Sequence, residues 1–156
     1  MSEQSALAGR IHEYIDDLEK VVKRASLLST KALKSGDDGY WDGVALNLHG
    51  FYGGVERIFE DIARTIDGNI PSGPDWHISL LVQMSAEALD RRPPVISREV
   101  RYALDEYRGF RHVVRNVYAF NFRPNRLKEL VDGLSGCFNS LKQELLVFVQ
   151  FLESMK

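Results

Sequence analysis

Residues 127–152 read LKELVDGLSGCFNSLKQELLVFVQFL, and their apolar residues recur at steps of three and four. On a helical wheel these residues form one stripe, made of Leu127, Leu130, Leu134, Phe138, Leu141, Leu145, Phe148 and Leu152. A strand would instead alternate apolar and polar residues with a period of two. The stretch therefore predicts one long amphipathic helix that needs other helices to cover its apolar side.

The same periodicity predicts two long helices in the first half of the chain. The first covers roughly residues 3–34. The second follows a cap at Asp37 or Asp38 and runs to about Asp67. Gly50, Gly53 and Gly54 lie inside it, although a glycine within a helix costs up to ~1 kcal/mol relative to alanine. We expect these glycines to permit close packing of another helix, or less readily a ligand, against the backbone.

Two more helices are predicted between these elements and residues 127–152. Asp75 can cap a short helix that runs to about Leu89, and Ser97 can cap a fourth long helix with Glu99 in its first turn. No segment alternates with a period of two over the length of a strand. We therefore predict an all-α, antiparallel up-and-down four-helix bundle with an additional short helix.

The composition is that of a soluble globular protein, with 156 residues of which 44% are hydrophobic and 27% charged. A formal net charge of -2 argues against a protein that coats nucleic acid through a global positive field. The single cysteine, Cys137, excludes an intramolecular disulfide and is predicted to be a small core residue. Without an apolar leader or a membrane-length apolar run, the chain is expected to be cytoplasmic, with no membrane contact.

A basic stripe lies on the predicted fourth helix, where residues 108–118 read RGFRHVVRNVY. It borders the apolar sector of the helix and consists of Arg101, Arg108, Arg111, His112 and Arg115. Like charges three or four residues apart cost roughly 0.2–0.5 kcal/mol per pair in an isolated helix. Either carboxylates on a neighbouring helix or subunit, or phosphate groups bound by the guanidinium forks, would offset this cost. The sequence leaves both partners open.

The remaining histidines, His12, His49 and His77, are interpreted mainly as structural or exposed residues. The chain has no H-E-x-x-H pair, no pair of cysteines and no G-x-x-x-x-G-K-[ST] loop. We therefore predict no metal site and no cofactor.

A helical bundle that carries RGFRHVVRNVY on its fourth helix resembles the HEPN domains. It is most similar to the HepT-like toxin subunits that are encoded with a minimal nucleotidyltransferase antitoxin. Residues 51–59 (FYGGVERIF), residues 74–77 (PDWH) and residues 92–97 (RPPVIS) also resemble one HepT-like branch. The resemblance implies a single HEPN-like helical domain over residues 1–156 and a metal-independent endoribonuclease with an R-x4-6-H motif. It further implies a homodimer with RNA bound in the cleft between two such motifs.

The sequence departs from this family motif at its centre. Counted from Arg111, His112 occupies the polar position and Asn116 the position of the catalytic histidine, so the two residues are exchanged. Counted from Arg108, only three residues lie between the arginine and His112, one fewer than the minimum of the R-x4-6-H motif. An imidazole titrates near ~6.5 and can transfer protons, whereas asparagine can only bind or orient. We predict Arg111, His112 and Asn116 as the catalytic group, with Arg108 and Arg115 binding phosphate.

Two further residues are assigned beside this motif. Tyr118 matches the tyrosine that accepts AMP from the nucleotidyltransferase antitoxin in the resembling family, although its ring could equally close the core. Glu56 is predicted to pair with the arginines across helices. The alternatives are a HEPN scaffold without catalysis, which would bind a nucleotide, RNA or a nucleotidyltransferase through the same face, and a plain oligomerisation or adaptor domain.

Overall fold

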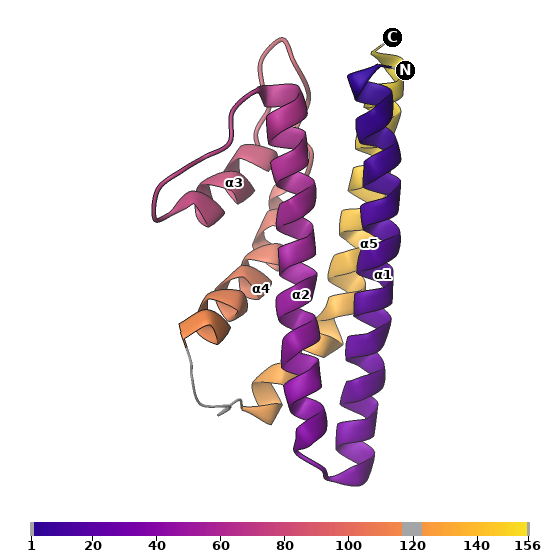
Figure 1. Cartoon of the computed structure of the whole chain (residues 1–156), viewed down its shortest axis with the longest axis vertical. Coiled ribbons are helices and arrows are strands. Elements are labelled where there is room, and N and C mark those ends of the chain that lie inside the picture. The colour runs from indigo at the N-terminus through magenta and orange to yellow at the C-terminus, as the bar shows by residue number, and fades with distance from the viewer. Residues whose placement is uncertain (1, 117–122, 156) are drawn as a thin grey trace.

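The computed structural model describes residues 2–116 and 123–155, and the side chains of residues 2–111 and 123–155. The helices are α1 (Glu3–Ser35), α2 (Gly39–Ile62), the π-helix η1 (Ala63–Asp67), α3 (Trp76–Met84), α4 (Arg98–Asn116) and α5 (Pro124–Ser154). Within these described ranges the extended structure is one isolated bridge between Ala88 and Arg92. The long helices alternate in direction, and both ends of the chain lie at the same end of the bundle (Figure 1). The predicted all-α bundle with an additional short helix is confirmed.

Helices α1 and α2 form a tightly packed antiparallel pair. Ser2 caps α1 by accepting a hydrogen bond from the Ser5 amide at 3.1 Å. A Cβ atom added at Gly54 would lie 2.7 Å from Leu18 Cδ2 of α1. The expected role in helix packing therefore holds for Gly54. At Gly53 the nearest atoms belong to Arg111 of α4 instead, and a Cβ at Gly50 would meet nothing within 4 Å.

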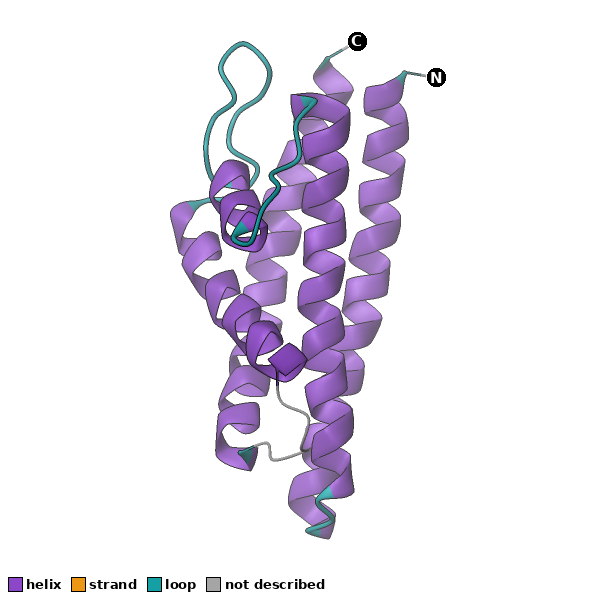
Figure 2. Cartoon of the chain, turned by 60° about the vertical axis from the view of Figure 1, so that its left-hand side comes forward, coloured by secondary structure: helices purple, strands orange, loops and turns teal. Residues whose placement is uncertain are grey.

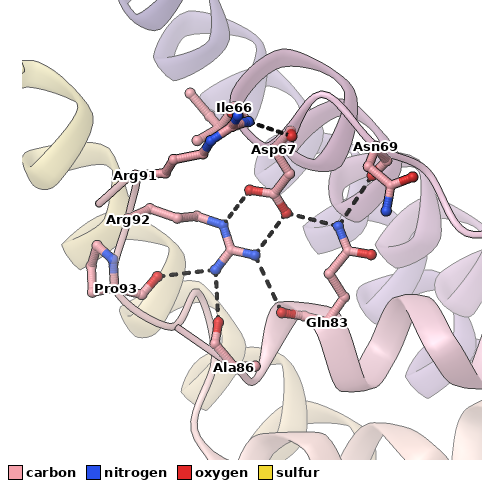
Figure 3. A network of polar contacts seen from close by, with 8 residues as sticks. All are labelled: Ile66, Asp67, Asn69, Gln83, Ala86, Arg91, Arg92 and Pro93. Atoms are coloured by element: carbon pink, nitrogen blue, oxygen red, sulfur yellow. Dashed lines mark hydrogen bonds and ion pairs between the residues drawn. The ribbon is translucent and has the colours of Figure 1, made fainter. Parts of the chain in front are cut away.

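Helix α3 ends at Met84, which corrects the predicted end near Leu89. The carbonyl groups that would continue the helix have tertiary partners. The Met84 carbonyl accepts hydrogen bonds from the Val95 and Ile96 amides at 2.9 and 3.2 Å, and the Gln83 carbonyl accepts one from Arg92 at 3.2 Å. Figure 3 shows the Arg92 side chain in this turn.

Helices α4 and α5 are joined at two places. The Ser97 hydroxyl caps α4 by accepting from the Val100 amide at 3.2 Å, as predicted, and Ser97 donates from its amide and hydroxyl to Glu144 of α5 at 2.6 and 2.8 Å. The Tyr107 hydroxyl donates to the Leu130 carbonyl at 2.6 Å. Helix α4 is inclined to α1, α2 and α5 (Figure 2), and Arg111 in its C-terminal half bonds to Glu56 of α2.

The core agrees with the predicted apolar stripes, and every member of the α5 stripe is buried. Cys137 is also buried, as predicted, and burial raises the pKa of its thiol to about 12. In the part of the chain that the structure describes, none of the helices combines the length and the apolar character needed to cross a membrane.

Candidate functional site

Three helices meet at Glu56, a carboxylate in the middle of α2 that is only 2% exposed. Arg111 of α4 donates from Nη1 to Glu56 Oε1, and His77 in the first turn of α3 bonds through Nδ1 to Glu56 Oε2. Removing one partner from a buried ion pair typically costs about 3–5 kcal/mol. Here both carboxylate oxygens have partners. We call Glu56, His77 and Arg111 the Glu56 cluster.

The imidazole of His77 is held on two sides. Its ring lies against the neighbouring Trp76 ring, with 3.6 Å between centroids and 32° between planes. The Nδ1 atom of His77 is the ring nitrogen that faces Glu56 Oε2. Arg111 bonds to the other oxygen of the same carboxylate. The side chain is 22% exposed.

The guanidinium of Arg111 is anchored through one nitrogen. Nη1 is committed to Glu56, while the buried Nε has no acceptor among the residues whose side chains are described. On the α2 side lies Gly53, where an added Cβ would be 3.9 Å from Arg111 Cζ. The side chain is 23% exposed. Arg111 thus has a fixed orientation and retains donors beyond those used by Glu56.

Two neighbours complete the electrostatics of the Glu56 cluster. Arg108 donates from Nε to Asp105 Oδ1 at 2.6 Å, and this hydrogen bond raises the pKa of Arg108. Tyr52, one turn before Glu56 on α2, is almost completely buried. Burial, and next the negative charge of Glu56, raise the pKa of Tyr52 far above its usual value, so its hydroxyl stays protonated.

The predicted site residues lie along the second half of α4. Arg108 and Arg111 are three residues apart, and both have carboxylate partners, on the same helix and on α2 respectively. His112, Arg115 and Asn116 lie in the last two turns of α4, but their side chains are outside the described residues.

Two more residues named in the sequence analysis, Tyr118 and Arg101, are not part of the Glu56 cluster as described. Tyr118 lies outside the described residues altogether. Arg101, at the other end of the basic stripe, donates to the Ser85 hydroxyl after α3 at 2.9 Å and stacks on Tyr102, so it lies away from the Glu56 cluster.

The pairing of Glu56 with an arginine was predicted, but the part played by His77 was not. Its position next to Trp76 at a helix start indicated a structural residue. Two features of the sequence could have indicated His77. Glu56 is a carboxylate on an apolar helix face and therefore needs hydrogen-bond donors, and residues 74–77 resemble a segment of one HepT-like branch. Among the described residues, no three His, Cys, Asp or Glu side chains come together as a metal site would require.

Comparison with known proteins gives one family. The sequence profile of a family described as HepT-like protein matches residues 43–152, which is more than half of the chain and contains all three members of the Glu56 cluster. No curated protein and no solved structure matches the chain.

Proposed function

The chain belongs to the HepT-like protein family, and we propose on this basis that it is a toxin-type, metal-independent endoribonuclease. The observation that carries the proposal is Arg111: a guanidinium on α4, fixed by the buried Glu56, partly exposed, and with donors to spare. A fixed fork of this kind suits a phosphodiester oxygen, because little side-chain entropy remains to be lost on binding.

Metal-free cleavage of RNA needs two proton transfers and a stabilised phosphate. The ribose 2′-oxygen attacks phosphorus after losing its proton to a base, and the bond from phosphorus to the 5′-oxygen breaks as that oxygen gains a proton. The products are a 2′,3′-cyclic phosphate and a 5′-hydroxyl. We assign proton transfer to His112, phosphate binding to Arg111 with Arg108 and Arg115, and an orienting role to Asn116.

The proposal includes a homodimer in which the basic stripes of two α4 helices line one groove. Glu56 and Asp105 already balance much of the charge of Arg111 and Arg108, so one stripe alone attracts a phosphate backbone weakly. Two stripes facing each other double the number of guanidinium groups, and symmetric closure is the common route to an oligomer. We further propose a nucleotidyltransferase antitoxin as partner, with Tyr118 as the acceptor of AMP.

Cleavage of a labelled single-stranded RNA by the purified chain tests this function. His112→Ala should lower the rate by ~10² or more, and Arg111→Ala should weaken both RNA binding and turnover. His12→Ala is the matched control, because His12 is an exposed histidine on α1, and it should cleave at the wild-type rate.

A second function is favoured by one observation, the exchange of His112 and Asn116 relative to the family motif. In that case the chain is a non-catalytic HEPN scaffold that binds a nucleotide, RNA or a nucleotidyltransferase through the same face. RNA binding without cleavage by the wild-type chain, or equal cleavage by wild type and His112→Ala, would favour this alternative.

A further inference from the structure

A second group of arginines, outside the basic stripe of α4, lines a pocket between α1 and the end of α2. The pocket has a volume of about 360 Å³ and is formed by Arg10, Tyr14, Arg57, Glu60, Asp61, Arg64 and Thr65. We call it the Arg10 pocket. Small-molecule sites in proteins begin at about 300 Å³. Every lining residue carries a charged group or a hydroxyl, so the pocket is suited to a polar ligand.

The guanidinium of Arg10 is held in one orientation by Asp61, whose side chain is 8% exposed. Asp61 accepts hydrogen bonds from Arg10 Nε and Nη2 at 2.7 and 2.9 Å, and from the hydroxyl groups of Tyr14 and Thr65 at 3.0 and 3.1 Å. Burial alone would raise the pKa of Asp61, but these hydrogen bonds, first those from Arg10, outweigh it and lower the pKa. The Arg10 side chain is 41% exposed, and Asp61 does not use its Nη1. Arg10 therefore keeps an oriented donor for a ligand.

The other two arginines of the pocket have no carboxylate partner. Arg57 of α2 and Arg64 of η1 are exposed, and neither forms an ion pair or a side-chain hydrogen bond within the part of the chain that the structure describes. Glu60 lies three residues after Arg57 and four before Arg64, a spacing that often permits ion pairs on a helix, yet it pairs with neither. Both guanidinium groups therefore keep all their donors.

The charges of the pocket favour an anion as its ligand. Arg10 and Asp61 balance each other, whereas the two positive charges of Arg57 and Arg64 face the single negative charge of Glu60. A phosphate group presents more oxygens than a carboxylate and can accept from three guanidinium groups at once. Arg64 lies in the π-helix η1, and π-helical turns are frequent at functional sites.

We propose that the Arg10 pocket is a phosphate-binding site, in which Arg10 is the oriented anchor and Arg57 and Arg64 supply further donors. The phosphate belongs either to a free compound such as a mononucleotide or to the backbone of an RNA strand. The inference goes beyond the proposed function, because it requires neither RNA cleavage nor the motif on α4.

Calorimetric titration with inorganic phosphate, AMP and a short single-stranded RNA, all at one ionic strength, tests the site. The double variant Arg57→Gln, Arg64→Gln removes two exposed guanidinium groups and leaves the pair of Arg10 with Asp61 intact, so the fold is retained. Binding should weaken at least about tenfold. The matched control is Lys20→Gln, Arg24→Gln, which removes two positive charges from exposed positions of α1 outside the pocket. Its binding should stay within about twofold of wild type, because distant surface charges are screened.

The three probes distinguish the sources of the phosphate. Binding of phosphate or AMP that is lost in the double variant assigns the pocket to a free compound. Binding of RNA alone, weakened in the double variant and not in the control, assigns it to the RNA backbone. Binding of none of the probes overturns the proposal, as does binding that the double variant retains in full or that the control weakens equally. Failure of the proposed function is a separate result, since it is measured by cleavage and not by binding at this pocket.

Discussion

Replacing Asp67 with alanine should destabilise the chain severely, because it leaves the buried Arg92 without a counter-charge. The Arg92 side chain is 1% exposed and binds Asp67 at 2.7 and 2.8 Å. It also donates to the carbonyl groups of Gln83, Ala86 and Pro93 (Figure 3). This guanidinium connects η1 to the turn that follows α3, and Asp67→Ala removes its carboxylate partner.

The expected loss follows from that burial. Removing one partner of a buried pair costs about 3–5 kcal/mol of unfolding free energy, since the remaining charge stays desolvated. Asp132→Ala is the matched control: Asp132 pairs with Lys128 at 2.8 Å but is 61% exposed. The loss there should be below about 1 kcal/mol.

Urea unfolding followed by circular dichroism measures both variants. Asp67→Asn, which keeps the side-chain volume and an amide oxygen, gives an intermediate value if Asp67→Ala is too unstable to measure. A loss for Asp67→Ala no greater than that for Asp132→Ala would refute the argument that burial of Arg92 sets the cost.

The same pair gives a pH dependence. Burial alone would raise the pKa of Asp67, but hydrogen bonds from Arg92 and Gln83 outweigh it and hold the pKa below its usual value of 3.8. The folded state therefore binds this proton less readily than the unfolded chain. The stability contributed by Asp67 is fully present above the unfolded pKa and is lost as the pH falls through the folded value. Unfolding experiments from pH 6 downward should show a larger loss in wild type than in Asp67→Asn, in which Asp61, whose pKa is also lowered by its hydrogen bonds, still contributes.

The remaining predictions concern packing, assembly and control. Gly50→Ala should raise the unfolding free energy by up to ~1 kcal/mol, whereas Gly54→Ala should lower it because its Cβ would approach Leu18 Cδ2; thermal unfolding compares the two. Sedimentation at micromolar concentration should give a dimer, and a strictly monomeric species would contradict the paired stripes. Incubation with the proposed nucleotidyltransferase partner and ATP should add AMP to wild type but not to Tyr118→Phe by intact mass; labelling that persists would exclude Tyr118 as the sole acceptor.

The helices were predictable because apolar periodicity and capping residues are local features of the sequence. The stripe of residues 127–152 and the Ser97 cap depend on neighbours within one helix, so periodicity and capping chemistry locate them. The end of α3 was not predictable in this way. The Met84 carbonyl accepts hydrogen bonds from the Val95 and Ile96 amides, and the Gln83 carbonyl accepts one from Arg92. These partners depend on the tertiary structure of the turn and not on local helix propensity.

The same distinction separates Glu56 from His77. A carboxylate on an apolar helix face requires a cation, so a pairing of Glu56 with the arginines of the fourth helix followed from the sequence, and the structure identifies Arg111 as the partner. His77 sits in a short helix joined to α2 by a long loop. Its contact with Glu56 depends on where α3 packs on α2, which no pattern within residues 74–84 specifies.

In the function we propose, the two partners considered for the arginine stripe, carboxylate and phosphate, act together. Glu56 binds only one nitrogen of Arg111, so it fixes the guanidinium without using all of its donors. It also removes most of the net charge, which agrees with a chain of net charge -2 that has no global positive field. We propose that a phosphate is then recognised by oriented donors instead of by bulk attraction.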